Sequence, residues 1–473
     1  MVYIVSASYF QSCRGFGSIF YFMEETSMEA FLNWVKTVND AVNGAVWGLP
    51  GLILLIGTGI LLTVGTKVFQ ISHVGHWWKN TIAGVFKKNS NATRKTDRKT
   101  ISQFQALCAA LAATVGTGNI AGVAAAIVTG GPGAVFWMWV AAFFGMMTNY
   151  AENVLGIYFR RKNSEGEWSG GAMYYLQDGL GGYKYEDSHS KASFKNLGKI
   201  LAVLFCIFTM LASFGIGSMG QVNKIVANVA AAFDVKALSS INVFGDISLY
   251  NIILGVLVMI LTAIITLGGV KRIANVAEKI VPFMVVLFVA GSLVIIGVNY
   301  TAIIPAFKAI FVNAFAPESF VKSATGGVLG AVITSMTNGF KRGVFSNEAG
   351  LGSSVMVHSN SDVVEPVKQG MWGIFEVFVD TIIVCTLSAF AVLSSGVVDL
   401  ATGRILESGV EASALVGASF ETLFGGFGKY FIAVAIMLFA FSTILGWSVY
   451  GTKAWEYLFG AKTTIIFKII HVI

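Results

Sequence analysis

The chain has 473 residues, of which 55% are hydrophobic and only 12% are charged, and its mean hydropathy is +0.72. Soluble domains carry about twice that charged fraction, so the composition excludes an ordinary soluble protein and predicts membrane-spanning helices. The net charge of +7 does not indicate nucleic-acid binding, because the basic residues gather in loops beside apolar runs, as the positive-inside rule describes.

The N-terminal part of the chain is expected to lead into one peripheral span. Residues 1–46 are predicted to form an N-terminal extension and an interfacial segment, and residues 1–27 receive no function. A first span is predicted at 47–66, because about 20 mostly apolar residues cross a bilayer. It ends at the basic loop 67–99, and we therefore expect it to run from outside to inside.

The next apolar segment, 101–129, has a polar interruption at its centre. Residues 113–122 read ATVGTGNIAG, with three glycines and an asparagine. In hydrocarbon, irregular backbone survives only where it is buried in protein or lines a cavity. The interruption therefore predicts a broken helix whose free amides and carbonyls bind a ligand, as in secondary transporters.

A second interruption lies in the other half of the chain. It occupies the centre of a predicted helix at 327–358, where residues 338–352 read NGFKRGVFSNEAGLG. The remaining predicted spans are 133–160, 197–233, 248–268, 277–298, 366–396 and 427–452. Two broken helices that enter from opposite sides indicate inverted repeats, 101–298 and 327–473, with a shared site at the midplane.

Both interruptions offer groups that suit an amino acid and a hard cation. In the first, free carbonyl oxygens suit Na⁺, and free N–H groups at a helix end suit a carboxylate. Thr117, Gly118 and Asn119 are therefore candidates for substrate binding. The alternative is that the glycines serve close packing between helices.

In the second interruption, Phe345 is expected to form a wall of the pocket, and Ser346 and Asn347 supply side-chain oxygens. Glu348 lies in an apolar helix, where an ionisable group is a functional candidate. Its alternative is a structural ion pair with a basic residue across the break, Lys341 or Arg342.

Further polar residues in the predicted spans allow more than one interpretation. Glu376 and Asp380 are one helical turn apart and face one side, so they could relay a proton, bind a cation, or fix helix packing. Trp372 could close the pocket or serve packing.

Glu152 is expected to form a solvated pair with Arg160 at a cytoplasmic end. We expect no enzyme, because no Ser/His/Asp or Cys/His set converges at one membrane depth.

Long motifs in this chain resemble those of the alanine or glycine:cation symporter family. The resemblance covers nearly all of residues 40–470 and rests on GTGNIAGVAAAIVTGGPGAVFWMW (116–139), GGAMYYLQDGLG (170–181), FKRGVFSNEAGLGSS (340–354), PVKQGMWGIFEVFVDTIIVCT (366–386) and LFAFSTILGW (438–447). It implies an all-α, LeuT-like inverted-repeat bundle with one extra N-terminal helix. It also implies Na⁺-coupled, or sometimes H⁺-coupled, uptake of small neutral amino acids.

The resemblance implies roles for individual residues as well. Ser442 and Thr443 would hold Na⁺ together with the backbone of Val115 and Gly118. Gln221, and its neighbour Asn223, match a polar family motif that could bind substrate. The expected partners are therefore a small neutral amino acid such as alanine or glycine, Na⁺ or H⁺, and the lipid bilayer, with no cofactor beyond the coupling ion.

The chain departs from the family pattern at several positions. The family usually has Pro at Ala172, Lys at Asn149, Asn at Ser218 and Ser at Lys224. The resemblance also predicts that the second repeat is truncated, because the chain ends at Ile473. The main expectation is a multi-pass symporter of the plasma membrane; the alternatives are an inactive remnant or sensor and, less favoured, a cation channel.

Overall fold

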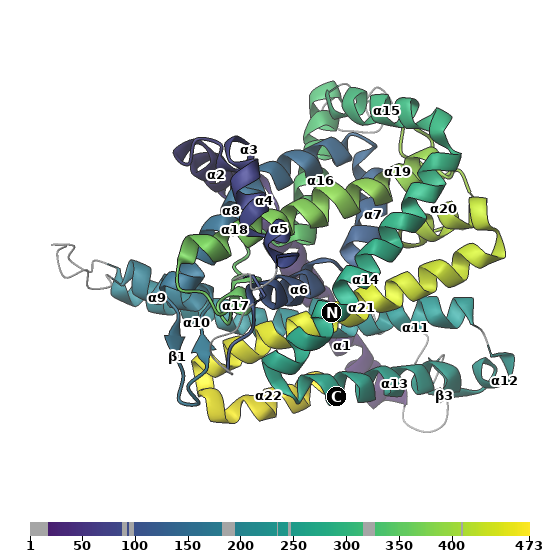
Figure 1. Ribbon diagram of the computed structural model, residues 1–473. Helices are drawn as coiled ribbons and strands as arrows, with labels where there is room; N and C mark the ends of the chain where they lie inside the picture. Colours follow the sequence, from purple (N-terminus) through teal and green to yellow (C-terminus); the bar gives the residue numbers. More distant parts are fainter. Residues whose placement is uncertain are drawn as a thin grey trace.

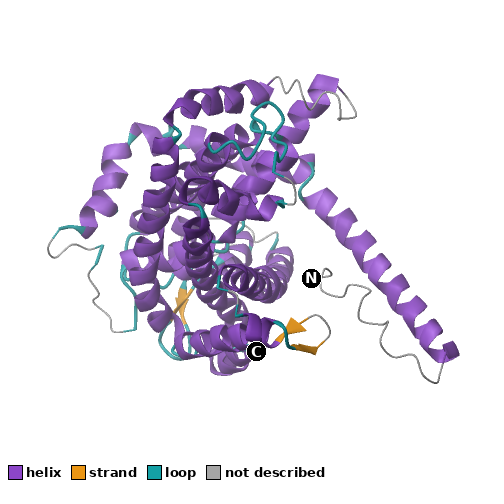
Figure 2. Ribbon diagram, turned by 90° about the vertical axis from the view of Figure 1, so that its right-hand side faces the viewer, coloured by secondary structure: helices purple, strands orange, loops and turns teal. Residues whose placement is uncertain are grey.

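The computed structural model of the chain is a bundle of helices with two short β-hairpins (Figures 1 and 2). It describes residues 18–87, 92–93, 99–181, 194–233, 235–244, 247–315, 327–407 and 410–473. Within these ranges, seven helices are long and apolar enough to cross a membrane, or eight if one bent pair is a single span. The expectation for residues 1–17 lies outside the described residues.

The helices of the first half are α1 Ser18–Val46, α2 Leu49–Gly65, α3 Phe69–Ser72, α4 Val74–Asn80, α5 Ile82–Val85, α6 Gln103–Thr114, α7 Val123–Gly130, α8 Ala134–Tyr158, α9 Ala172–Leu180, α10 Lys195–Phe214, α11 Gly220–Ala232 and α12 Lys236–Ser239. Those of the second half are α13 Leu249–Thr266, α14 Gly269–Val298, α15 Ile303–Phe315, α16 Gly327–Asn347, α17 Val355–His358, α18 Pro366–Val377, α19 Thr386–Ser394, α20 Leu415–Phe424, α21 Gly426–Phe459 and α22 Thr464–Val472. The hairpins pair β1 Arg161–Lys162 with β2 Trp168–Ser169, and β3 Asn242–Phe244 with β4 Ile247–Ser248, both antiparallel.

The first predicted break is confirmed. Helix α6 begins at a capping box, in which the Ser102 hydroxyl accepts from the Gln105 backbone N–H and the Gln105 side chain accepts from the Ser102 N–H. It ends at Thr114, and the chain resumes as a π-helical turn, Gly118–Gly122, that continues into α7. The two halves are bent by 53°. The glycines permit this interruption because a residue without a Cβ atom has fewer steric clashes where the backbone turns.

The second predicted break is also present. Helix α16 ends at Asn347, and the backbone of Glu348 then takes a left-handed conformation with φ of 57°. Gly350 and Gly352 follow with φ of 91° and 69° before α17 begins. A left-handed conformation at a non-glycine residue is costly, so Glu348 is held there by its surroundings. Helix α16 is not among the seven long apolar helices.

Two predicted continuous spans contain π-helical segments that the sequence pattern did not reveal. One is Gly215–Met219, between α10 and α11, and the other is Phe378–Cys385, between α18 and α19. Such bulges change which side chains share a helix face, and they often occur at functional sites. The second segment contains Asp380.

Helix α6 lies at the centre of the bundle. Eleven of its twelve residues are buried, and it packs against α14 and α21 (Figure 1). The outer helix α13 instead exposes large apolar side chains, among them Ile253, Leu257, Ile260 and Ile264. This pattern fits a protein whose interior surrounds α6 and whose apolar outer faces contact lipid. The division into inverted repeats stays a prediction.

Close packing of α6 and α21 generates a stability prediction. A Cβ atom added at Gly446 would lie 2.5 Å from the Ala113 Cβ and 2.7 Å from its Cα. We therefore expect Gly446→Ala to destabilise the protein by about 1–3 kcal/mol, as overpacking does. The control is Gly297→Ala on α14, where nothing lies within 4 Å. Thermal unfolding of the purified protein in detergent measures both, and equal melting temperatures would contradict this packing.

Candidate functional site

The side chain of Asn119 organises the first break. It is fully buried, and its Oδ1 accepts a hydrogen bond of 2.9 Å from the Gly116 backbone N–H. Its Nδ2 donates to Asp380 Oδ1 at 2.6 Å. One amide therefore satisfies a backbone donor freed by the break and also connects the break to the helix segment between α18 and α19.

The second break reaches the same carboxylate. The Ser346 hydroxyl donates to Asp380 Oδ2 at 2.9 Å. The adjacent Asn347 donates from Nδ2 to Thr381 Oγ1 at 3.1 Å, and that hydroxyl in turn donates to Asp380 Oδ2 at 2.8 Å. The structure therefore brings together Asn119, Ser346 and Asn347, which the sequence analysis assigned to the two interruptions.

Asp380 is the residue on which both breaks converge. Its side chain is fully buried and accepts hydrogen bonds from Asn119, Ser346 and Thr381. Among the described residues, no basic side chain forms an ion pair with it. A buried carboxylate without a cation is costly unless it is well hydrogen-bonded. A cation that enters this region would therefore be favoured electrostatically.

Glu376 belongs to a separate network. Its Oε2 accepts from Asn149 Nδ2 at 3.0 Å and lies 3.0 Å from His358 Nε2. The His358 Nδ1 lies 2.6 Å from Gln369 Nε2; since the amide nitrogen only donates, Nδ1 is the acceptor and Nε2 carries the proton. His358 was missed by the sequence analysis, because a single histidine in an apolar segment has no motif spacing.

Glu348 makes a local contact within the second break. Its Oε2 accepts a hydrogen bond from the Ser353 hydroxyl. In the described part of the chain it forms no ion pair with Lys341 or Arg342, so that interpretation is wrong. The ammonium of Lys341 lies instead over the Trp47 ring, 5.8 Å from its centroid.

The expected solvated pair between Glu152 and Arg160 is also wrong. The Glu152 carboxylate accepts from the backbone N–H groups of Gly350 and Gly352, at 3.2 and 2.9 Å. Arg160 donates instead to the carbonyls of residues 359, 361 and 363. Broken helices leave backbone groups without helical partners, and these two side chains from α8 and its end satisfy several of them.

The four residues assigned to Na⁺ differ in their position. Thr443 lies at the first break, since its Oγ1 is 3.4 Å from the Ala113 carbonyl oxygen and 2.4 Å from the Cβ position of Gly116. Val115 is fully buried at the same break. Ser442 points elsewhere: its hydroxyl donates to the Phe439 carbonyl of its own helix at 2.9 Å and contacts Met284 Sδ at 3.4 Å.

A cavity of about 320 Å³ lies where the breaks meet. Its wall includes Thr117, Gly118, Gln221, Phe345 and Thr443. The Thr117 hydroxyl and Gln221 Oε1 are 3.1 Å apart and form a hydrogen bond. Four of the predicted substrate residues, Thr117, Gly118, Gln221 and Phe345, thus line one cavity. Asn119, Ser346 and Asn347 do not line it and contact Asp380 and Thr381 instead.

Trp372 does not belong to this group. It is fully buried, and its Nε1 donates to Gln103 Oε1 at 2.9 Å near the start of α6.

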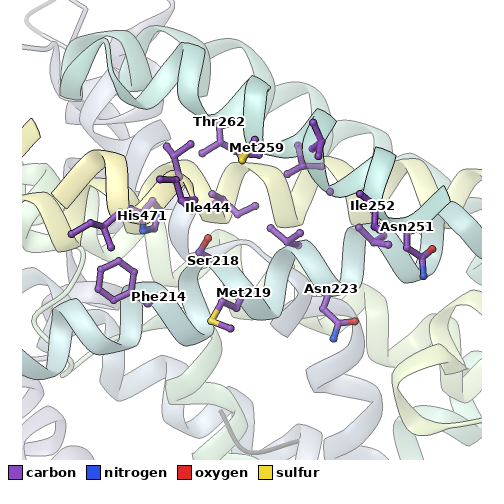
Figure 3. A pocket seen from close by; sticks show the side chains of 18 of the residues that line it. Phe214, Ser218, Met219, Asn223, Asn251, Ile252, Met259, Thr262, Ile444 and His471 are labelled. Carbon is purple, nitrogen blue, oxygen red and sulfur yellow. The ribbon is translucent and has the colours of Figure 1, made fainter. Parts of the chain in front are cut away.

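Another cavity, of about 810 Å³, lies between α11, α13, α21 and α22 (Figure 3). It is lined by mainly apolar side chains and by Asn223, the neighbour of Gln221 in the polar motif, and by no other residue considered for substrate or Na⁺.

Comparisons with known proteins show which family the chain resembles. The chain matches the sodium:alanine symporter family over residues 32–473. It is 41% identical over 442 residues to the sodium/alanine symporter AgcS of Methanococcus maripaludis, covering 93% of this chain and 87% of that protein. It is 33% identical over 424 residues to the probable sodium/glutamine symporter GlnT of Bacillus subtilis, covering 89% and 77%.

The fold is similar to that of a solved transporter. The crystal structure of MhsT in complex with L-phenylalanine superposes with a TM-score of 0.50 at 15% identity, over 80% of this chain and 79% of that one. The LeuT-like fold class expected from the sequence is therefore confirmed. Together with the match over residues 32–473, these findings show that the chain belongs to the sodium:alanine symporter family.

Proposed function

We propose that this multi-pass, Na⁺-coupled amino-acid symporter carries alanine or glycine across the plasma membrane by alternating access. The observation that supports the choice of substrate is the small cavity, about 320 Å³, between the two breaks. It lies at the low end of the volumes typical of ligand pockets. AgcS, the sodium/alanine symporter, is also more similar to this chain than GlnT is.

In the proposed mechanism, Na⁺ binds first at the break between α6 and α7. Backbone carbonyls near Val115 and Gly118 and the Thr443 hydroxyl supply oxygen ligands, which a hard cation prefers. Both the Ser442 and Thr443 hydroxyls donate to the Phe439 carbonyl of their own helix. We assign Ser442 a supporting role, because its second contact is Met284 Sδ, whereas that of Thr443 is the Ala113 carbonyl oxygen at the break. The bound charge would then organise the adjacent backbone for the substrate.

The amino acid then completes the site. Its carboxylate would face the N–H groups of the first break, where the start of a helical segment favours an anion. Gln221 would bind a polar group of the substrate, and Phe345 would cover its side chain; both line the cavity. Ser346 and Asn347 would act through Asp380 and Thr381, to which they are bonded.

Of the three carboxylates considered for coupling, we favour Asp380. It is hydrogen-bonded to residues of both breaks, whereas Glu376 is bonded to Asn149 and His358 and Glu348 to Ser353. A cation near Asp380 would therefore affect its hydrogen bonds to both broken helices at the same time. Family membership does not favour a remnant, a sensor or a channel.

The proposal predicts Na⁺-driven accumulation of alanine. The purified chain in proteoliposomes should take up radiolabelled alanine in a saturable manner when Na⁺ is higher outside than inside. Unlabelled glycine should compete at similar concentration and phenylalanine should not, because the cavity is small. Uptake that is the same with choline in place of Na⁺ would contradict Na⁺ coupling, and equal competition by phenylalanine would contradict the assigned substrate.

The Na⁺ site predicts a different effect for two threonines of α21. Thr443→Val removes a hydroxyl beside the break and should raise the Na⁺ concentration for half-maximal uptake by about tenfold, the equivalent of about 1.4 kcal/mol. The control, Thr452→Val, removes a buried hydroxyl that bonds only to the Ser448 carbonyl, at 2.6 Å, and should leave the Na⁺ dependence unchanged. An equal response of the two variants would argue against a ligand role for Thr443.

A further inference from the structure

A second cavity, of about 700 Å³, adjoins the proposed substrate site. The two cavities share Thr117, Gly118, Gln221 and Phe345 in their walls. The hydrogen bond between Thr117 and Gln221 and the ring of Phe345 therefore lie between them. Phe345 is 37% exposed, and its ring is 3.9 Å from the Cβ position of Gly118. A molecule in the second cavity is therefore separated from the first by residues that line both, which also include Ile216.

The second cavity is lined by basic side chains, which are absent from the wall of the first, where Glu348 is the ionisable residue. Lys224 of α11 and Arg342 of α16 line it, and Glu411, beside the 3₁₀ turn Ala412–Ala414, lines it as well. Arg342 and Lys224 are partly buried, and Glu411 is exposed. The cavity thus combines two cationic side chains with one carboxylate.

These charged groups are available to a ligand. Within the described ranges, neither Arg342 nor Glu411 forms an ion pair or a side-chain hydrogen bond with another residue. The nearest acidic residue in the sequence, Glu348, is bonded to Ser353 instead. A partly buried guanidinium without an anionic partner is costly, and a bound anion would offset that cost.

The chemistry of these groups matches an amino-acid zwitterion. A guanidinium offers a rigid pair of donors that suits a carboxylate, and such charge-assisted hydrogen bonds are the strong ones. Lys224 would add to the positive potential, while Glu411 would attract an ammonium group. We propose that this cavity, which we call the vestibule, is a first binding site for the zwitterionic amino acid, with Arg342 as the ligand of its carboxylate.

The proposal of a vestibule rests on the proposed function, and it adds a binding step before the amino acid enters the smaller cavity. Helix α16 begins after the segment that the charge pattern places outside, so the vestibule is on the extracellular side of the breaks. The amino acid would be captured there by charge and then pass Phe345 into the smaller cavity, where the first break receives its carboxylate. Charged walls of this kind raise the local concentration of a ligand and the rate of its association.

The test compares two neighbouring basic residues. Arg342→Gln removes the vestibule cation, and Lys341→Gln is the matched control, because Lys341 is also basic but lies over Trp47 and does not line the cavity. The quantities to be measured are KM and kcat for alanine uptake in proteoliposomes at saturating Na⁺. Arg342→Gln should raise KM for alanine by about tenfold, as loss of a charge-assisted hydrogen bond does, and leave kcat unchanged. Lys341→Gln should change neither.

Two further measurements separate binding from folding. Arg342→Lys keeps the charge and should recover part of the lost affinity, which a merely misfolded variant would not. Raising ionic strength with choline chloride at constant Na⁺ should increase KM of the unaltered protein, because salt screens charges, and should affect Arg342→Gln less. A KM that is unchanged in Arg342→Gln, or a fall in kcat alone, would overturn the vestibule.

Failure of the proposed function would have a different signature. If the unaltered chain shows no Na⁺-driven uptake, the transport proposal fails, and equilibrium binding of radiolabelled alanine to the purified protein then decides the vestibule. Weaker binding to Arg342→Gln than to Lys341→Gln would support the vestibule in that case. Equal binding to the two variants would overturn it.

Discussion

The structure depends on one buried carboxylate that two interrupted helices share. Asp380 accepts from Asn119 at the first break and from Ser346 at the second. Each break frees backbone groups that a membrane interior cannot solvate, and neither would be stable as an isolated element. Their shared acceptor makes the two positions interdependent. We propose that a change at one break is transmitted to the other through these hydrogen bonds, because coupling of an ion to a substrate requires the two sites to affect each other.

Side chains from neighbouring helices support the breaks in the same way. Glu152 on α8 accepts from two backbone N–H groups of the second break, and Arg160 donates to carbonyls beyond α17. Asn119 accepts from the Gly116 N–H within the first. The carboxylate of Glu152 thus accepts from backbone N–H groups, and the guanidinium of Arg160 donates to backbone carbonyls. The irregular backbone is held by polar side chains in a protein whose interior is mainly apolar.

Much of the fold could be predicted from the sequence, because hydropathy and glycine-rich interruptions depend on local composition. Both breaks and the long spans were found in this way. The networks could not be predicted, because they join residues far apart: Asn119 and Asp380 are separated by 261 positions. Periodicity assumes a regular helix, and it therefore could not reveal the π-helical segment Phe378–Cys385 that contains Asp380. Sequence proximity suggested an ion pair of Glu348 with Lys341 or Arg342 as an alternative to a functional role, whereas Glu348 accepts a hydrogen bond from Ser353.

The most direct test of the shared carboxylate exchanges the side chains of Asp380 and Asn119, which contact each other. Asp380→Asn alone should lower Na⁺-driven alanine uptake by about a hundredfold, because it removes the charge and leaves one acceptor oxygen for the three donors Asn119, Ser346 and Thr381; losses of about 2–5 kcal/mol are typical of broken buried charge contacts. Asn119→Asp alone places two carboxylates together and should be equally damaging. The double variant restores one amide and one carboxylate and should recover at least about tenfold, since residues in contact couple by about 0.5–3 kcal/mol. A double variant no more active than either single one, with all three equally folded, would contradict the account.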